Sequence, residues 1–553
     1  MSVEKLIVDH METWTSALQT RSTAGRGSSG KIDLYGIKKL RELILELAVR
    51  GKLVPQDPND EPASDLLKRI AAEKAELVKQ GKIKKQKPLP EISEEEKPFE
   101  LPEGWEWVHL PDIYCSISES SRKIKSSEIL PEGKYPVIEQ SQEFISGYCN
   151  NECLLIKLNN PVIVFGDHTR NIKFIDFDFV VGADGVKILS PILICERFFF
   201  WQLRSFKLDV RGYARHFKVL NSCLFALPPI AEQERIVEKV SSLMSLCDQL
   251  EQQSLTSLDA HQQLVETLLG TLTDSQNTAE LAENWARISE HFDTLFTTEA
   301  SVDALKQTIL QLAVMGKLVP QDPNDEPASE LLKRIAQEKA QLVKEGKIKK
   351  QKPLPPISDE EKPFELPEGW EWCRIGNIVN IKSELVSPKD YLNLYQVAPD
   401  IIEKGTGRVI SKRTVKESGV KGPNSRFYKG QIVYSKIRPS LSKVFLAEYN
   451  GLCSADMYPL DCYINPNYLL KYILSIPFLM QVKKAENRIK MPKLNSDSFY
   501  NIIVAIPPYN EQQAIFDKIN SIEAVCNGLI SYIGIYHKTQ LHFADALTDA
   551  AIN

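Results

Sequence analysis

Two long stretches of the chain carry apolar residues at alternating steps of three and four. The first follows Leu227-Pro228-Pro229 and has apolar positions at Ile236, Val240, Leu243, Cys247, Leu250, Leu264 and Leu268. The second follows Ile506-Pro507-Pro508 and has them at Ile515, Ile519, Ile522, Cys526, Leu529, Ile533, Tyr536, Phe543 and Leu547. This spacing is typical of coiled coils, and proline is tolerated where a helix starts. We therefore predict two long helices that pack on each other, and a core helix of a larger bundle is the alternative.

An internal repeat surrounds these two stretches. Residues 37–107 and 302–372 align without a gap at an offset of 265, and 57 of the 71 positions are identical. Both copies contain GKLVPQDPNDEPAS and GKIKKQKPLP and end in EEKPFELPEGWEW. A shorter echo, Glu232-Gln233 and Glu511-Gln512, follows the two Pro-Pro pairs. Because the offset far exceeds the period of solenoid repeats, the pattern indicates a duplicated frame.

The two copies of this frame are circularly permuted. One is continuous over 227–372, and the other is split between 506–553 and 1–107. The first long helix ends in LTDS and the second in LTDA, close to the C-terminus. We therefore expect the two ends of the chain to lie close together.

Dissimilar segments, 108–226 and 373–505, separate the frame copies and mix strand patterns such as VIVFGDH and QIVYSKI with short helices. The predicted fold is α+β, with two mixed α/β domains joined by two long helices in an antiparallel coiled coil with pseudo-twofold symmetry. The expected segments are 1–107, 108–226, 227–372, 373–505 and 506–553.

Each frame copy also predicts two shorter helices. LRELILELAVRGKLV is amphipathic and should end at Gly51, as its counterpart should end at Gly316. Ser64 and Ser329 are the expected N-caps of the next helix. The basic GKIKKQKPLP that follows is interpreted as a solvated linker, and phosphate contact is the alternative.

Charge is distributed unevenly along the chain. The net charge is −5, but Lys and Arg outnumber Asp and Glu by 20 to 10 in 373–505 and by 14 to 13 in 108–226. These segments carry +10 and +1, so the remainder carries −16. A strongly basic segment in an acidic protein points to a polyanionic partner, although a solvated basic face remains the alternative.

Composition and motifs exclude several classes of protein. A chain with 43% hydrophobic residues, ten scattered cysteines and no C-x-x-C fits a multidomain cytoplasmic protein. Residues 25–31 match G-x-x-x-x-G-K, but Ile32 stands where a phosphate loop needs Ser or Thr. Ile506-Pro507-Pro508-Tyr509 resembles the amino-methyltransferase motif, but that motif needs a polar first residue. The histidines form no metal-ligand set. We interpret the chain as non-catalytic, without metal or cofactor.

The order of these motifs resembles the DNA-specificity subunit of type I restriction-modification systems, most closely the type IB subfamily. The resemblance covers essentially the whole chain and rests on LPPIAEQERIVEKV and GKLVPQDPNDEPAS…LPEGWEW. It implies that 108–226 and 373–505 are target recognition domains for double-stranded DNA. It also implies two methyltransferase subunits and restriction–translocation subunits as partners, which use S-adenosylmethionine, ATP and Mg²⁺. The helical span 236–268, at ~1.5 Å per residue, would be long enough to separate two half-sites by about one DNA turn.

Candidate DNA contacts lie in two loops of each recognition domain and at two glutamines. Arg and Lys read guanine edges or bind phosphates, and Gln pairs with adenine. In the first domain the candidates are Gln140, His168, Thr169, Arg170, Lys173, Arg211, Tyr213, Arg215, His216 and Lys218. In the second they are Gln396, Lys436, Arg438, Ser442, Lys443, Arg488, Lys490 and Lys493.

Two other functions are alternatives to this interpretation. A methyltransferase fused to its own recognition domains would need a catalytic domain for which the frame leaves no room. A coiled-coil scaffold that does not bind DNA would not need the +10 segment.

Overall fold

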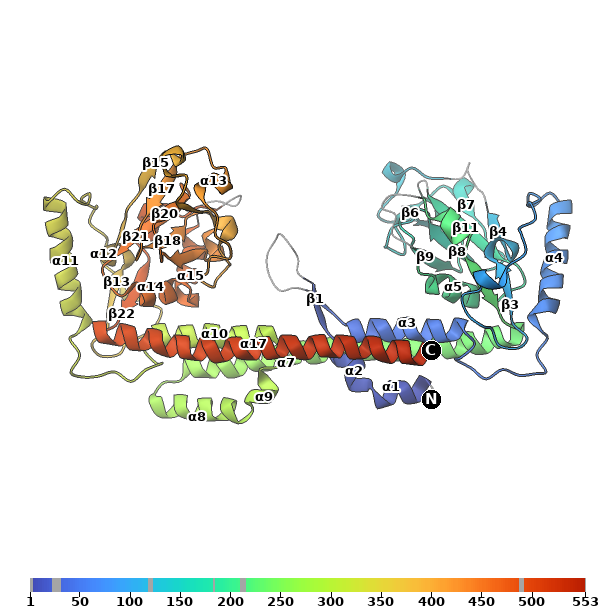
Figure 1. Cartoon of the computed structure of the whole chain (residues 1–553), viewed down its shortest axis with the longest axis horizontal. Coiled ribbons are helices and arrows are strands. Elements are labelled where there is room, and N and C mark those ends of the chain that lie inside the picture. Colours follow the sequence, from blue (N-terminus) through green and yellow to red (C-terminus); the bar gives the residue numbers. More distant parts are fainter. Residues whose placement is uncertain are drawn as a thin grey trace. The chain divides into compact units, whose positions relative to one another are not determined.

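The computed structural model describes residues 3–21, 31–117, 123–182, 185–208, 215–486 and 492–552. Packing divides the chain into two compact units (Figure 1). Unit 1 comprises Met1–Ser257 and Tyr536–Asn553, and unit 2 comprises Leu258–Ile535. Each unit contains one sheet domain, a set of frame helices and part of each long helix. The five segment boundaries expected from the repeat stay a prediction.

The frame of unit 1 precedes its sheet domain. Its elements are α1 (Val3–Asp9), α2 (Met11–Ser16), β1 (Gln19–Arg21), β2 (Lys31–Asp33), α3 (Tyr35–Val49) and α4 (Ala63–Lys79). As predicted, α3 stops before Gly51, whose φ of 66° favours glycine. The expected cap at Ser64 is wrong, because the N-cap of α4 is Pro62 and the first N–H, that of Ala63, donates to Gly104 O at 2.9 Å. Residues 25–30 of the phosphate-loop match lie outside the described residues.

The sheet domain of unit 1 is built from three sheets. One is antiparallel with the order β4-β11-β8-β9, one is mixed with the order β6-β5-β10-β7, and β3 pairs with β12. The strands are β3 (Glu106–His109), β4 (Tyr114–Ile117), β5 (Tyr135–Ile138), β6 (Gly147–Cys149), β7 (Leu155–Ile156), β8 (Val162–Gly166), β9 (Ile172–Ile175), β10 (Phe179–Val181), β11 (Val186–Pro191) and β12 (Leu224–Leu227). Helices α5 (Glu196–Ser205) and α6 (Phe217–Leu220) complete it.

The frame and sheet domain of unit 2 repeat this plan. The frame helices are α8 (Thr278–Glu290), α9 (Phe292–Leu295), α10 (Glu299–Val314) and α11 (Ala328–Lys344), and the N-cap of α11 is Pro327 instead of Ser329. The strands are β13 (Glu371–Arg374), β14 (Val379–Ile381), β15 (Glu384–Val386), β16 (Tyr395–Val397), β17 (Asn424–Phe427), β18 (Ile432–Ser435), β19 (Val444–Leu446), β20 (Gly451–Ser454), β21 (Met457–Cys462) and β22 (Ile503–Ile506). The domain's helices are α12 (Ile375–Ile378), α13 (Val415–Ser418), α14 (Pro466–Ile473), α15 (Ile476–Ala485) and α16 (Ser496–Tyr500).

The two sheet domains share a topology although their sequences differ. The antiparallel sheet β14-β21-β18-β19 corresponds strand by strand to β4-β11-β8-β9, and β13 pairs with β22 as β3 does with β12. In the mixed sheets, β20 lies between parallel β16 and antiparallel β17, as β10 lies between β5 and β7. The fourth strand is added next to β5 in unit 1 but next to β17 in unit 2. The domains therefore share a scaffold and differ at its edge.

The two long helices are α7 (Ile230–Asp274) and α17 (Tyr509–Ile552). In unit 2, Val265, Leu269 and Leu272 of α7 share a core with Cys526 and Ile533 of α17 and with apolar residues of α10. In unit 1, α3 contacts both helices, through Arg41 to Glu251 of α7 and Tyr35 to Asp545 of α17. The long pair is thus confirmed, with a third helix packed on it in each unit.

The apolar stripe does not keep the predicted register along the whole of each helix. Leu264 is 51% exposed and its neighbour Val265 is buried; likewise Phe543 is 45% exposed and Ala544 is buried. Because an α-helix has 3.6 residues per turn, a strict 3.5-residue pattern drifts around the helix. No side chain of 251–264 or 534–543 is fully buried.

The Glu-Gln pair after each Pro-Pro joins the frame to the sheet domain. Glu232, in the first turn of α7, accepts hydrogen bonds from Trp105 Nε1 at 2.9 Å and Gln56 Nε2 at 3.1 Å. Glu511 accepts the same bonds from Trp370 (2.9 Å) and Gln321 (3.2 Å). Burial raises the pKa of both carboxyl groups. This glutamate contact explains why both copies repeat the pair.

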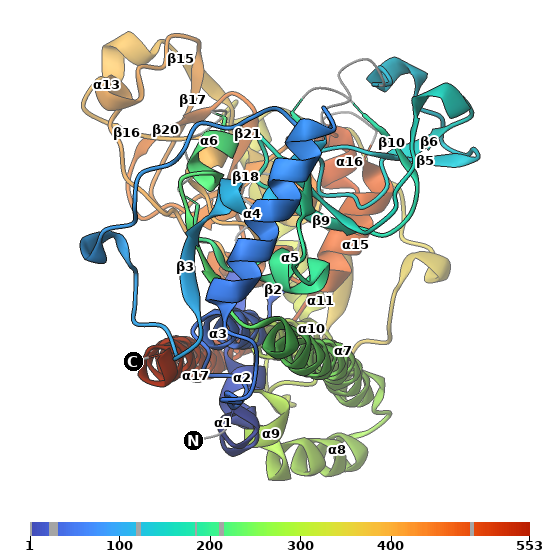
Figure 2. The same cartoon turned by 90° about the vertical axis from the view of Figure 1, so that its right-hand side faces the viewer.

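The glutamine of each pair faces the sheet domain. Gln233 Oε1 accepts from Cys195 N at 3.0 Å, and Gln512 Oε1 accepts from Asn465 N at 2.9 Å. Both ends of the chain belong to unit 1 and lie near each other in both views (Figures 1 and 2). In the same unit Lys52 Nζ donates to Ile552 O at 2.7 Å.

Candidate nucleic-acid interface

The turn between β8 and β9 carries three of the candidate residues of unit 1, and Lys173 follows in β9. It is closed by Gly166 N donating to Asn171 O and Arg170 N donating to Gly166 O, both at 2.8 Å. Arg170 has a φ of 63°, a left-handed conformation that is unfavourable for a residue with a Cβ. Thr169 is exposed, and His168 and Arg170 are half-buried. The turn thus presents polar side chains on a strained backbone.

Gln140, two residues after β5, supports this turn from the mixed sheet. Its Oε1 accepts from His168 N at 3.2 Å, and its carbonyl accepts from Asn171 Nδ2 at 2.8 Å and from the Thr169 hydroxyl. The end of β5 and the β8–β9 turn therefore form one surface.

The loop before the closing strand β12 meets the same turn. His216 N donates to Asp167 O, and Phe217 N donates to Asp167 Oδ1, both at 2.8 Å. Arg215 is exposed, whereas His216 is buried and its Nδ1 lies 3.1 Å from Asp167 O. The structure therefore brings the two predicted loops together and gives His216 an internal place. Arg211 and Tyr213 lie outside the described residues.

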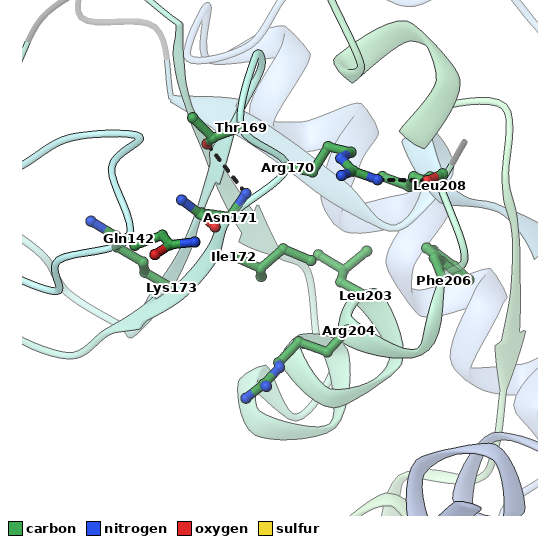
Figure 3. A pocket seen from close by; sticks show the side chains of 10 residues that line it. All are labelled: Gln142, Thr169, Arg170, Asn171, Ile172, Lys173, Leu203, Arg204, Phe206 and Leu208. Atoms are coloured by element: carbon green, nitrogen blue, oxygen red, sulfur yellow. Dashed lines mark hydrogen bonds between the residues drawn. The ribbon is translucent and has the colours of Figure 1, made fainter. Parts of the chain in front are cut away.

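A polar hollow of about 480 Å³ opens beside the turn (Figure 3). Gln142, Asn171 and Arg204 line it, together with Arg170, whose Nη1 donates to Leu208 O at 2.9 Å. Burial, with Arg41 nearby, lowers the pKa of Arg204. Neither Arg204 nor Gln142 belongs to a predicted loop, so no local sequence signal marked them.

Unit 2 builds the corresponding turn between β18 and β19. Arg438 is exposed and has a φ of 45°, and Ser442 has a φ of 46°. Arg438 N donates to Pro492 O and Leu494 N donates to Lys436 O, both at 2.9 Å. The turn is thus paired with the loop before the closing strand, as in unit 1. Arg488 and Lys490 of that loop lie outside the described residues.

Two candidate lysines at the start of β9 and β19 bind carbonyl groups inside their own domain. Lys173 is 6% exposed, and its ammonium donates to the carbonyls of Glu139 (2.8 Å), Glu143 and Phe144 (3.4 Å). Burial lowers the pKa of Lys173. In unit 2, Lys443 Nζ donates to Pro399 O. Both lysines connect the turn to the mixed sheet.

Lys436 and Lys493 also have partners within the domain. Lys436 Nζ donates to Ala455 O at 2.7 Å, and Lys493 Nζ lies 3.3 Å from Asp456 Oδ1. Within the described part of the chain, the guanidinium of Arg438 makes no hydrogen bond or ion pair, so it is the most available cation of this turn.

Gln396 occupies a different position from Gln140 and is 3% exposed in β16. Its Oε1 accepts from Arg413 Nε at 3.0 Å, and its Nε2 donates to Asn424 Oδ1 at 3.3 Å. Arg413 also forms a bidentate pair with Asp400 at 2.9 and 3.0 Å. A hollow of about 370 Å³ lies over Gln396, Arg413 and Asn424. Sequence analysis missed the last two, which come from separate segments.

Comparison with known proteins decides what these paired domains are. The family described as the type I restriction modification DNA specificity domain matches residues 102–260 and 367–533, one match for each sheet domain with its helix. The chain is 51% identical to the specificity subunit of the type I restriction enzyme EcoAI of Escherichia coli, over the full length of both chains. It is 48% identical to that of EcoEI, also over both full lengths.

The chain belongs to the type I restriction-modification DNA-specificity family. The solved structure of an HsdS subunit from Thermoanaerobacter tengcongensis is similar at 15% identity, over 83% of this chain and 98% of that one, with a TM-score of 0.36. A solved type I system chain gives 14% identity over 82% and 99%, with a TM-score of 0.42.

As a specificity subunit the chain is non-catalytic and carries no cofactor. Ile506-Pro507-Pro508 joins β22 to the start of α17, as the helix-start interpretation predicts. Among the described residues, no cluster of His, Cys, Asp and Glu could hold a metal ion, and no helix has the length and apolar character to cross a membrane.

Proposed function

We propose that this specificity subunit reads a bipartite, asymmetric DNA target, with one half-site bound by the recognition domain of each unit. The two turns, β8–β9 and β18–β19, supply the side chains closest to the bases, supported by the loops that precede β12 and β22. The half-sites differ because the side chains on these turns differ. Each domain alone reads only a few base pairs, so two are needed for useful selectivity in a genome.

The observation that carries this proposal is an arginine with positive φ in each of the two turns. Only four non-glycine residues in the described part of the chain have positive φ, and Arg170 and Arg438 are two of them. They lie in corresponding turns, between β8 and β9 and between β18 and β19, although these turns differ in length and sequence. A strained backbone persists where the structure over-determines it, and such positions cluster at binding sites.

The other candidate residues have graded roles in this proposal. Thr169, Arg215 and Arg438 are exposed and are the first choices for DNA contact, with His168 and Arg170 beside them. Gln140, Lys173, Lys443 and Gln396 position these side chains through their internal hydrogen bonds. The candidates outside the described residues, Arg211, Tyr213, Arg488 and Lys490, stay part of the proposal on sequence alone.

The subunit acts within a larger enzyme. In this proposal it binds two methyltransferase subunits, which use S-adenosylmethionine, and restriction–translocation subunits, which use ATP and Mg²⁺. The complex works in the cytoplasm, which is where its DNA substrate and a reducing environment for the ten free cysteines are found.

Selection of bound sequences tests the proposal. The subunit, purified with its methyltransferase partners, is incubated with random duplexes, and bound DNA is recovered and sequenced. We expect two short, different half-sites at a fixed spacing, and no methyl transfer by the subunit alone. A single continuous site, or no sequence preference, would contradict the proposal.

A further inference from the structure

A basic segment follows α4 and α11 in the two units and has the same sequence, GKIKKQKPLP, in both. We call residues 81–90 and 346–355 the basic arms. The glycine of each arm lies two residues beyond the last residue of the helix and has a left-handed φ, 71° at Gly81 and 69° at Gly346. Lys82 N and Lys347 N then donate back into the helix, to Leu77 O at 3.0 Å and Leu342 O at 2.9 Å. Each arm therefore leaves its helix in a defined direction.

All four lysines of each arm are exposed, and the arms contain no acidic residue. Seven of the eight have no ion pair or hydrogen bond through the ammonium group with any residue that the structure describes, and the exception is Lys347, 2.8 Å from Glu345. The arm lysines are Lys82, Lys84, Lys85 and Lys87 in unit 1 and Lys347, Lys349, Lys350 and Lys352 in unit 2. Some acidic residues of the turns that follow pair with other cations, as Glu94 does with Lys97 and Glu361 with Arg374.

Each arm is held against the recognition domain of its own unit. In unit 1, Lys74 Nζ donates to Gln86 Oε1 of the arm at 3.0 Å and to Pro111 O of the domain at 2.8 Å. His109 Nε2 of β3 donates to Pro90 O at 2.9 Å. In Figure 2 the chain runs from the end of α4 around the flank of this domain before it enters β3.

Unit 2 repeats this attachment. Lys339 Nζ donates to Gly376 O at 2.6 Å and Val379 O at 3.0 Å, and lies 3.4 Å from Gln351 Oε1 of the arm. Arg374 Nε donates to Pro355 O at 2.9 Å. In both units the arm's glutamine accepts from the helix lysine that also binds the domain, while the lysines of the arm are exposed.

The attachment argues against a plain solvated linker. A linker needs neither a fixed path nor unpaired lysines beside a DNA-reading domain. Interaction with the helix dipole accounts for Lys79 and Lys344 in the last turn of each helix, but this effect fades within one turn. It does not account for the later lysines of the arms, Lys84, Lys85 and Lys87 and their counterparts in unit 2.

A DNA backbone fits the arms better than a protein surface does. Protein interfaces are depleted in Lys and enriched in aromatic residues and Met, and the arms contain only Lys, Gln, Pro, Gly, Ile and Leu. Phosphate groups accept Lys as a point charge. Identical arms beside two different recognition domains also require a ligand that is the same at both half-sites, as the backbone is.

We propose that each basic arm binds phosphates of the DNA backbone next to the half-site that its own unit reads, independently of sequence. The inference rests on the proposed function, because it places duplex DNA on both recognition domains. It reverses the interpretation of these segments as solvated linkers.

Charge-neutralising variants of the full-length subunit, in complex with its methyltransferase partners, test the arms. One variant carries Lys82→Gln, Lys84→Gln, Lys85→Gln and Lys87→Gln, and a second carries the four matching changes in unit 2. Binding is measured against salt concentration on the target duplex and on a duplex with one half-site altered. The slope of log K against log salt should become shallower by ~0.9 for each phosphate that a lysine no longer neutralises. The affinity ratio between the two duplexes should not change.

Two controls separate the arms from general loss of charge. Lys→Arg at the same four positions keeps the charge and should retain the wild-type slope. Lys68→Gln with Lys333→Gln removes exposed lysines of α4 and α11 that already pair with Asp65 (2.6 Å) and Glu330 (2.7 Å), and should leave binding unchanged.

An unchanged salt slope or a changed affinity ratio overturns the proposal. An unchanged slope means that the arms do not touch DNA, and if methyltransferase binding weakens at the same time, the arms bind protein. A changed affinity ratio means that they read bases. If the wild-type complex itself does not discriminate the two duplexes, the proposed function fails, while the salt slopes still decide whether the arms bind phosphates.

Discussion

At the scale of single residues, each recognition domain has an arginine with a left-handed backbone conformation in a turn of its antiparallel sheet. Arg170 and Arg438 lie in corresponding turns, and the guanidinium of Arg438 has no partner among the described residues. An arginine whose direction is fixed by its backbone can present two N–H groups of its guanidinium to a guanine edge. In the proposed function, the left-handed backbone sets the direction of each arginine toward the DNA.

We therefore expect Arg170→Ala and Arg438→Ala to impair different halves of the same target. A bidentate contact to guanine should cost ~1–3 kcal/mol and relax one position of one half-site. A phosphate contact should instead lower affinity for all sequences and reduce the salt slope by about one. Each variant is measured on duplexes altered in one half-site and then in the other.

Arg→Lys at each position is the matched control, since it keeps the charge and loses the bidentate geometry. If the lysine variant retains selectivity, the contact is to a phosphate. If both alanine variants relax the same half-site, the assignment of one domain to each half-site is wrong.

At the scale of elements, the length of α7 stands out. It has 45 residues from Ile230 to Asp274, whereas α17 has 41 from Tyr509 to the equivalent Asp549, a difference of four. The central part of α7, 251–264, contains no fully buried side chain. Residues can therefore be removed from the middle of α7 without removing a side chain of the hydrophobic core.

Deletion of 253–256 from α7 should select DNA targets with a shorter spacer and the same half-sites. Four residues span about 6 Å of helix, which lies between one and two base-pair steps of ~3.4 Å. The measurement is selection of bound sequences, and replacement of the same four residues by alanine is the control that should keep the spacer. New half-site bases at the old spacing would refute this role of the helix.

Much of the element plan could be predicted from the sequence because it repeats or is periodic. The long helices, the frame and the stop at Gly51 all follow from local patterns. The cap at Ser64 was wrong because the contact of Ala63 with Gly104 comes from outside the segment. Leu264 was predicted to lie on the apolar face and is exposed, because a 3.5-residue pattern drifts around a helix with 3.6 residues per turn.

The candidate site could be predicted only in part, for a related reason. The two loops of each domain were identified by their basic residues, and the structure brings them together. Arg413 and Asn424 were missed because they meet Gln396 only through the folding of separate segments. Lys173 looks like a DNA contact in sequence, and only the structure shows its ammonium bound to carbonyls.

At the scale of the whole molecule, the segments follow one another in the order of a circular repeat of two units, and the two ends of the chain interrupt this repeat within unit 1. Unit 1 contains both ends of the chain, and unit 2 is continuous from 258 to 535. The junction between α7 and α8 in unit 2 corresponds to the place where the C-terminus and N-terminus meet in unit 1. The ends of the chain should therefore be movable to the junction between α7 and α8 without loss of either unit.

We expect a permuted chain, with Asn553 joined to Met1 through a short linker and new ends between Ser275 and Gln276, to fold and to keep target selectivity. The measurements are the denaturant midpoint and the affinity ratio between target and altered duplexes. A permutant opened inside β8, between Phe165 and Gly166, breaks the sheet of one recognition domain and should lose one half-site. Failure of the first permutant to select either half-site would show that the units are not equivalent.

The glutamate contact with Trp105 and Trp370 has a consequence for heredity. Each recognition domain is bounded by the same residues in both units, with LPEGWEW on one side and Pro-Pro followed by Glu-Gln on the other. Because the residues that border each domain are shared by both units, one domain can be replaced by another without changing the frame. Because Glu232 and Glu511 bind residues that belong to the frame, an incoming domain inherits an intact attachment. We therefore expect the inheritance of a different domain between these boundaries to change one half-site while the fold is kept.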